Sequence, residues 1–159
     1  VRIILRFKKM KKNIISCLII LLMSSCISTK LTIQNINELA IKPALNEDFS
    51  SFIITKNATS KKYGYDPDYP VNVNFTSEED GLNNQIRFLK ALAGPKGEKI
   101  KYTQKDPCCP FPSKRANTGA GIIDVFEITW EGQNKPILLY INKFEKGELF
   151  IPIGLSARK

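Results

Sequence analysis

The spacing of apolar side chains predicts one well-defined helix in the middle of the chain. Four apolar residues recur at helical spacing and form one stripe: Leu82, Ile86, Leu89 and Ala93. Ser77, with Asp80 three residues later, has the spacing of a capping box, although Asp stands where Glu or Gln is usual. Gly94-Pro95 ends the pattern, because proline cannot continue a helix. We therefore expect a helix over residues 77–93.

Strand-like patterns occupy most of the chain around this helix. Six segments carry alternation or short apolar runs: 49–55, 71–75, 99–103, 122–130, 137–144 and 149–153. The segment 122–130 is apolar on both faces, which favours a central place in a sheet. Short turns separate the last three segments, so we expect them to form an antiparallel meander. The expected fold class is α+β, an antiparallel β-sheet with one main helix packed on it.

Two segments rich in proline and glycine are expected to be loops. They are residues 61–70, KKYGYDPDYP, and residues 104–121, QKDPCCPFPSKRANTGAG. Ahead of the strands, residues 26–48 are expected to be a tether with one short element, which Pro43 stops. Residues 49–159 then form a single α+β domain of ordinary size.

The first 25 residues have the pattern of an export signal. This segment holds six basic residues and no acidic one, and an apolar run covers residues 14–23. Ser24 and Ser25 follow, directly before Cys26. A basic head, a short apolar run and small residues at a boundary are typical of a secretory signal peptide. A run of ten residues rises about 15 Å as a helix, which is too short for a hydrocarbon layer about 30 Å thick.

The residues around Cys26 sharpen this prediction. The stretch Leu22-Met23-Ser24-Ser25-Cys26 resembles the lipobox of bacterial lipoproteins. In that family the cysteine becomes the first mature residue, and its sulfur carries a diacylglyceride. The resemblance implies a signal peptide over residues 1–25, with Met10 as the expected start, and a lipid anchor on Cys26. Two or more acyl chains hold a protein stably, since each buried CH₂ contributes about 0.8 kcal/mol. The alternative is an ordinary signal peptide in which Cys26 has no role.

The net charge changes its meaning once the signal peptide is set aside. The whole chain has 24 basic and 15 acidic residues, a net charge of +9, which alone would favour nucleic-acid binding. Without residues 1–25 the chain keeps 18 basic and 15 acidic residues, or +3, so no nucleic-acid partner is expected. No acidic run follows Cys26. In lipoproteins of the Bacteroidota, which this chain resembles, such a run often accompanies surface display. Its absence favours an outer-membrane anchor with the domain facing the periplasm.

The sequence contains no histidine, which excludes several kinds of site. Ser-His-Asp and Cys-His nucleophiles and histidine metal sites all require it. Gly94 and Gly97 lack the spacing of a P-loop, and Gly119 and Gly121 precede a predicted strand rather than a helix. We therefore expect neither a cofactor nor a metal.

The adjacent cysteines Cys108 and Cys109, which lie between Pro107 and Pro110, are the most unusual feature of the sequence. An exported protein can form disulfides. The options are a vicinal disulfide, two free thiols, a bridge to another chain, or a metal site, although two thiolates fall short of the four ligands of structural zinc. The pair could clamp its loop, contact a ligand or partner, or act in redox or thiol chemistry, which needs a base or a positive neighbour.

Carboxylates provide the other candidate site. Asp66 and Asp68 flank Pro67, and Glu127 lies near the end of a predicted strand. Paired carboxylates can perform acid–base chemistry, whereas Asp-Pro-Asp is more often a turn. Together with Arg87 and Tyr140, these carboxylates would form a pocket if the fold brought them to the cysteine pair.

Several motifs together resemble a family of small uncharacterised lipoproteins of the Bacteroidota. They are YGY at 63–65, RFLKALAGPKGE at 87–98, CCPF at 108–111, WEG at 130–132, YIN at 140–142 and PIG at 152–154. The resemblance covers residues 61–155. Members sometimes carry the name 2-dehydro-3-deoxyphosphooctonate aldolase. That aldolase family forms a (β/α)₈ barrel of at least about 200 residues. The 134 residues after the signal peptide, with one clear helix, cannot build such a barrel, so the resemblance implies no catalytic residues.

Two functions are consistent with these features. The first is a non-enzymatic, membrane-anchored periplasmic lipoprotein that serves as a binding or interaction module for an envelope protein partner. The alternative is a small envelope enzyme or redox protein that uses the Cys108-Cys109 loop or the Asp66 and Asp68 pair. A cleft joining the cysteine loop to Arg87, Glu127 or Tyr140 would favour a ligand or active site, and a flat, filled surface would favour the first function.

Overall fold

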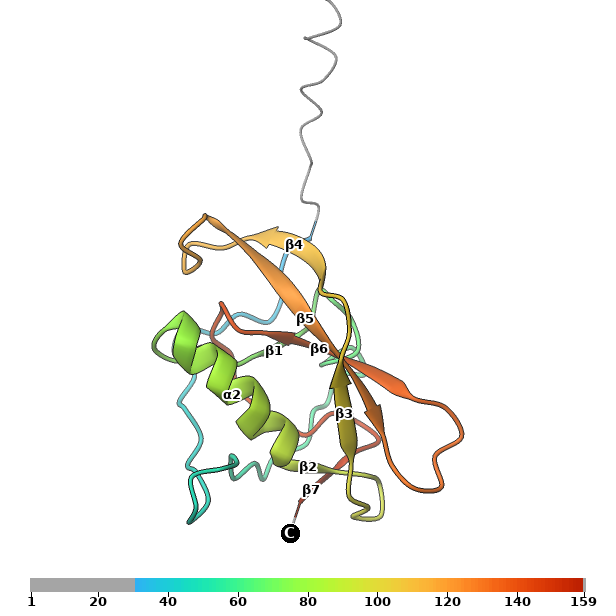
Figure 1. Ribbon diagram of the computed structural model, residues 1–159. Coiled ribbons are helices and arrows are strands. Elements are labelled where there is room, and N and C mark those ends of the chain that lie inside the picture. Colours follow the sequence, from blue (N-terminus) through green and yellow to red (C-terminus); the bar gives the residue numbers. More distant parts are fainter. Residues whose placement is uncertain (1–30, 159) are drawn as a thin grey trace, which may run out of the picture.

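The computed structural model describes residues 31–158 as one helix packed against a mixed β-sheet (Figure 1). The predictions for the signal peptide and for Cys26 lie outside these residues. The elements follow in chain order: β1 (Val71–Asn72), α2 (Glu78–Lys90), β2 (Leu92–Ala93), β3 (Lys101–Gln104), β4 (Cys108–Pro112), β5 (Ala120–Thr129), β6 (Ile137–Asn142) and β7 (Ser156–Ala157). No helix among the described residues is long and apolar enough to cross a bilayer.

β5 is the central strand of the sheet. It pairs antiparallel with β6 along one edge. Along its other edge it pairs antiparallel first with β3 and then with β4. β1 extends the sheet beyond β6 as a parallel neighbour, with Val71 opposite Ile141. β2 and β7 form a separate antiparallel pair. The α+β class and the central place of β5 are therefore confirmed, and the sheet is mixed rather than wholly antiparallel.

The helix begins where the sequence predicts, but it buries a different face. Ser77 is the N-cap, and its hydroxyl accepts a hydrogen bond of 3.2 Å from the Asp80 backbone N–H. The helix ends at Lys90, because Leu92 and Ala93 pair with β7. The predicted apolar stripe is wrong at its first two positions, since Leu82 and Ile86 are 47% and 38% exposed.

The buried face of α2 is set by close approach and by amide hydrogen bonds. A Cβ on Gly81 would lie 2.1 Å from the carbonyl oxygen of Lys143, so only glycine lets the helix pack this closely. Asn84 donates to the carbonyl of Val73 at 2.9 Å, and Gln85 donates to the Asp124 carboxylate at 2.6 Å. These polar residues are fully buried and satisfied, which explains why an apolar pattern alone gives the wrong helix face.

The segment 104–121, predicted to be a loop, contains the strand β4. Its pairing with β5 places Cys108 opposite Ile123 and Phe111 opposite Gly121, with a register irregularity between them. Prolines lack an N–H donor and are tolerated only at sheet edges and bulges. β4 satisfies this condition, because among the described strands it pairs with β5 alone and its other edge is free of strand pairing.

Two predicted strands are reduced to single bridges. In the segment 49–55, Phe52 bridges to Leu45, and in the segment 149–153, Ile151 bridges to Asn57. At the end of β6 the Asn142 side-chain oxygen accepts hydrogen bonds from two backbone N–H groups, those of Phe144 (2.9 Å) and Glu145 (3.3 Å). This turn directs the chain away from β6, so the third strand of the expected meander does not form.

Side chains of the described residues gather in two hydrophobic clusters. The main core lies between α2 and the sheet, and its largest fully buried members include Phe88, Leu89, Ile128 and Leu139. A second group, the β4 cluster, lies under β4 and has these buried members: Ile33, Phe111, Ala116, Ile123 and Phe144.

The described part of the expected tether lies against the domain. Ile33 and Ala40 are buried, and the backbone N–H of Asn37 donates to the carbonyl of Lys146 at 2.8 Å. The Asn35 side chain donates to the carbonyl of Pro70 at 2.7 Å. Residues 31–48 therefore contribute contacts to the same unit as residues 49–158.

Candidate functional site

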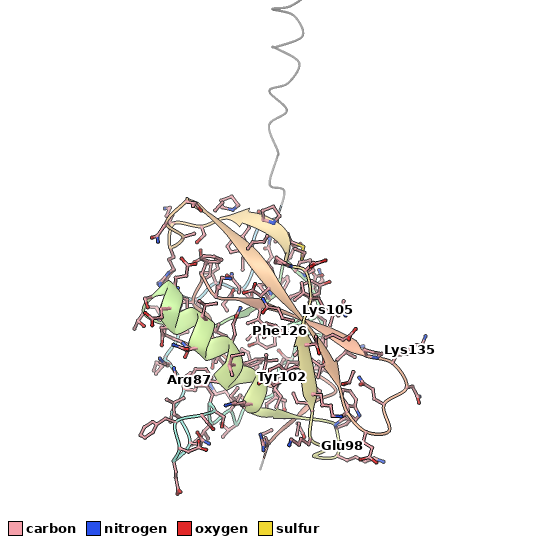
Figure 2. All side chains as sticks on the ribbon, viewed as in Figure 1. Arg87, Glu98, Tyr102, Lys105, Phe126 and Lys135 are labelled. Atoms are coloured by element: carbon pink, nitrogen blue, oxygen red, sulfur yellow. A yellow bond between two sulfur atoms is a disulfide. The ribbon has the colours of Figure 1, made fainter. Side chains whose placement is uncertain are left out.

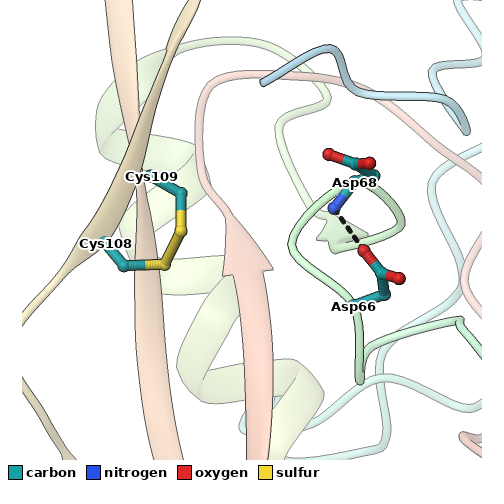
Figure 3. The surroundings of a disulfide bond; sticks show 4 residues. All are labelled: Asp66, Asp68, Cys108 and Cys109. Atoms are coloured by element: carbon teal, nitrogen blue, oxygen red, sulfur yellow. Dashed lines mark hydrogen bonds between the residues drawn. A yellow bond between two sulfur atoms is a disulfide. The ribbon is translucent and has the colours of Figure 1, made fainter. Parts of the chain in front are cut away.

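Cys108 and Cys109 form a vicinal disulfide at the start of β4, which selects one of the four options left by the sequence (Figure 3). Both residues are partly buried. Cys109 has a φ of +62°, in the left-handed region that non-glycine residues rarely adopt. This conformation coincides with the register irregularity between β4 and β5. The disulfide is therefore part of a local kink in an edge strand.

The β4 cluster supports the disulfide from below. Cys108 and Cys109 both pack against it, as does Tyr140 of β6. Phe111 and Phe144 meet edge to face, with ring centroids 6.3 Å apart. A Cβ on Gly121 would lie 2.6 Å from Phe111 and 2.8 Å from Phe144, so these rings leave room for glycine alone at this position.

Polar side chains fix the chain that follows β4. The Ser113 hydroxyl donates to the buried Glu145 carboxylate at 2.5 Å and accepts the backbone N–H groups of Arg115 and Ala116, each at 3.2 Å. The Arg115 guanidinium forms an ion pair with Glu38, and its Nε lies 3.9 Å from Glu145. This group, which we call the Glu145 brace, joins the turn after β4 to the bend after β6 and to the N-terminal segment.

A broad, open hollow of about 870 Å³ lies beside the disulfide. Side chains from β5 and β6 line it in two cross-strand pairs, Val125 with Tyr140 and Glu127 with Leu138. Lys105, between β3 and β4, lies with its Nζ 3.5 Å from a Glu127 oxygen, and Cys108 completes this side. We call this surface the β4 hollow.

The β4 hollow unites three of the seven candidate residues in the domain, namely Cys108, Glu127 and Tyr140. Arg87 does not reach it. Its Nη1 donates to the Asn84 amide oxygen at 3.0 Å and lies 3.8 Å from Asp80. Figure 2 shows Arg87 on the helix, apart from Lys105 at the hollow.

Asp66 and Asp68 also lie outside the β4 hollow. The Asp66 carboxylate accepts the backbone N–H of Asp68 at 2.9 Å, and its backbone carbonyl accepts the N–H of Tyr69 at 2.9 Å (Figure 3). The backbone carbonyl of Asp68 accepts the N–H of Gln34 at 2.8 Å. Asp-Pro-Asp is therefore a turn that holds the N-terminal segment, which is the more usual role of this motif.

Burial and hydrogen bonding shift the pKa values of a few groups. Burial raises the pKa of Tyr65 to about 12, so this phenol stays protonated near neutral pH. Burial raises the pKa of Tyr63 further in the same direction. Burial alone would raise the pKa of Asp80, but hydrogen bonds from Lys42, Thr76 and Asn84 hold it below its ordinary value. None of these groups lines the β4 hollow.

The sequence did not predict the buried ionic group at Asp124. Its carboxylate accepts hydrogen bonds from Gln85 at 2.6 Å, from the Lys143 ammonium at 3.0 Å and from Gln104 at 3.4 Å. A lone aspartate within the apolar run 122–129 was the available signal. These donors engage both carboxylate oxygens, so the buried charge is satisfied. Because Gln85 belongs to α2 and Asp124 to β5, the hydrogen bond between them links the helix to the sheet.

Metal-binding side chains do not cluster in the described part of the chain. Across residues 31–158, no three His, Cys, Asp or Glu side chains gather closely enough to hold a metal ion. The arrangement at the β4 hollow provides an aromatic ring, apolar surface, paired charges and a disulfide. Of these features, the aromatic ring of Tyr140 belongs to the residue types that are enriched at protein–protein interfaces. Searches against protein-family models, curated proteins and solved structures find no match to this chain.

Proposed function

We propose that this protein is a membrane-anchored lipoprotein of the cell envelope, and that its domain binds a protein partner through the β4 hollow. The anchor rests on the export-signal pattern and on the lipobox resemblance at Cys26. The lack of an acidic run after Cys26 supports the periplasmic side of the outer membrane.

The observation that carries the binding proposal is the β4 hollow itself. Leu138, one of its lining residues, is 42% exposed and lies opposite Glu127 in the strand pairing. Tyr140 is held in place, because its backbone N–H donates to the carbonyl of Gly64 at 2.8 Å and its ring packs on the β4 cluster. An aromatic side chain held rigidly beside exposed apolar surface loses little conformational entropy on binding.

The position of the N-terminal segment indicates which end of the domain would lie nearest the membrane. Leu31 packs against the same cluster as the disulfide. Cys26 precedes Leu31 by five residues, which span at most about 18 Å when fully extended. A lipid on Cys26 would therefore hold the β4 end close to the bilayer. The partner we propose is consequently itself a membrane-associated protein.

The anchor can be tested by labelling cells with a palmitate analogue. We expect Cys26→Ala to abolish labelling and to release the protein from the membrane fraction, because the sulfur is the site of acylation. Cys17→Ala is the matched control and should leave both unchanged. Unchanged membrane partitioning of the Cys26 variant would refute the anchor.

The binding site can be tested with two leucines of similar exposure on different faces. Leu138 is 42% and Leu82 is 47% exposed, the latter on α2. We expect Leu138→Asp to remove the native complex seen on a non-denaturing gel, because a charge would replace an exposed apolar side chain of the hollow. Leu82→Asp should retain that complex. Equal behaviour of the two variants would contradict a site at the β4 hollow.

A second candidate function, thiol–disulfide exchange, is supported by one observation. Cys108 lines the β4 hollow, so its sulfur can be approached from that side. A redox role predicts that glutathione buffers of increasing reducing strength convert the disulfide reversibly to two alkylatable thiols. Failure to alkylate either cysteine of the folded protein in the most reducing buffer would exclude it.

A further inference from the structure

A second hollow lies at the opposite end of the domain from β4. It has a volume of about 740 Å³ and is formed by the end of α2, by β2 and β7 and by the turn over residues 94–99. Figure 1 shows β2 and β7 at one end of the molecule and β4 at the other. This volume falls within the range of small-molecule sites, about 300–1,000 Å³. We call this surface the basic hollow.

The charge of the basic hollow has one sign. Its charged lining residues are all cations: Lys90, Lys96, Lys99 and Arg158. None of them forms an ion pair within residues 31–158. The β4 hollow differs, because its Lys105 is already paired with Glu127.

The nearest carboxylates do not neutralise these cations. Glu98 accepts the backbone N–H of Lys96 at 2.8 Å and does not line the hollow. Asp48 lies near Lys90, and its pKa is lowered first by hydrogen bonds from Ser50 and last by the Lys90 charge, with no ion pair between them. All four cations therefore lack an ion-pair partner within residues 31–158 and are available to a ligand.

The floor of the basic hollow is apolar, and its rim is charged. Leu89, Leu92 and Ile100 are buried lining residues, whereas Lys96 and Lys99 are exposed. The last turn of α2 brings partial negative charge to this end, worth about half an elementary charge. Four full positive charges exceed it, and the Ala91 N–H already caps the carbonyls of Arg87 and Phe88.

We infer that the basic hollow binds a small organic anion with an apolar body, of the class of medium-chain carboxylates. The cations attract the head group, and the apolar lining covers the body. The site faces away from the Leu31 end of the domain, which favours a dissolved anion over the head group of a bilayer lipid. This inference is independent of the partner proposed for the β4 hollow.

The fluorescence of Trp130 can report on ligand binding at this site. Trp130 is the single tryptophan of the sequence. Its Cγ lies 3.1 Å from the place a Cβ would take on Gly94, so it packs on the turn that borders the basic hollow. Ligand binding should therefore change the tryptophan fluorescence.

Titration of the full chain carrying Cys26→Ala with decanoate tests the inference without detergent. We expect a saturable change in Trp130 fluorescence that weakens at high salt, because exposed charge pairs are screened. Decanol and decyltrimethylammonium, which share the apolar body, should bind more weakly. Equal binding of either control would overturn the inference, as would a fluorescence change that does not saturate.

Charge variants locate the site. Lys96 and Lys99 are exposed, so Lys96→Gln with Lys99→Gln should leave the fold intact and weaken decanoate binding by about fivefold. The matched control is Lys114→Gln with Lys135→Gln, two exposed lysines outside this hollow, and it should bind normally. Equal weakening by both pairs would contradict the assignment. Binding of the same chain to phosphatidylglycerol vesicles that decanoate displaces would assign this surface to the membrane and overturn the inference.

Discussion

The main core and the β4 cluster differ in the interactions that stabilise the chain around them. The main core contains 18 buried residues, so apolar burial contributes much of the stability of α2 on the sheet, whereas the β4 cluster contains five. The β4 end adds specific restraints to its small cluster, namely the vicinal disulfide and the Glu145 brace. A region with few apolar contacts opens more easily than a core. The geometry of the β4 hollow therefore depends on restraints that single substitutions can remove while the main core stays folded.

The largest expected effect comes from the main core. Phe88 is fully buried between α2 and the sheet. We expect Phe88→Ala to lower the free energy of unfolding by about 3–5 kcal/mol, because it removes apolar burial and leaves a cavity. Urea unfolding measures this loss, and Phe49→Ala, at a side chain 70% exposed, is the control with little effect. A loss for Phe88→Ala as small as that of the control would contradict the division between the clusters.

The Glu145 brace should have a smaller and local effect. Glu145→Gln weakens the hydrogen bond from Ser113 and removes the charge opposite Arg115, so we expect a loss of about 1–2 kcal/mol. Hydrogen exchange should accelerate over residues 113–121 and remain slow in α2. Glu148→Gln, at an exposed pair with Lys56, is the matched control. Faster exchange throughout α2 would show that the two regions unfold together.

The disulfide should contribute less than the brace to stability. Its ring closes over adjacent residues, and so short a loop constrains the unfolded chain by only about 1 kcal/mol. We expect Cys108→Ser with Cys109→Ser to lower the midpoint of thermal unfolding slightly and to weaken partner binding more clearly. An unchanged complex would show that the kink at Cys109 does not shape the hollow.

Asp80 provides the smallest effect, and its sign follows from its lowered pKa. A carboxylate with a lowered folded-state pKa stabilises the protein above its unfolded pKa and loses this contribution as the pH falls through the folded value. Asp80→Asn should therefore cost a few tenths of a kcal/mol at neutral pH, and this difference from the wild type should be smaller at an acidic pH below the ordinary pKa of aspartate, about 3.9. Urea unfolding at both pH values measures it. A difference that grows on acidification would contradict the pairing with Lys42.

Local signals in the sequence predicted part of this architecture. The Ser77 cap, the strands β5 and β6 and the central place of β5 follow from short-range patterns. The face of α2 does not, because the close approach of Gly81 to Lys143 joins distant parts of the chain. The strand β4 was missed because its prolines are typical loop signals. They are compatible with an edge strand, but that becomes evident only from the pairing with β5.

The candidate site divides in the same way. Cys108 was conspicuous in sequence, but its placement beside Glu127 and Tyr140 depends on strand register. Register cannot be obtained from the composition of either strand. Arg87, Asp66 and Asp68 are instead occupied by local partners in the helix and in a turn. The lipid anchor at Cys26 remains a prediction from the sequence.

Photo-crosslinking in intact cells tests the proposed partner site most directly. A photoreactive amino acid replaces Leu138 at the β4 hollow in one variant and Leu82 on α2 in the other, two leucines of similar exposure. The proposal predicts one discrete adduct with an envelope protein from position 138 and none from position 82. No adduct at position 138, or the same adduct from both positions, would contradict it.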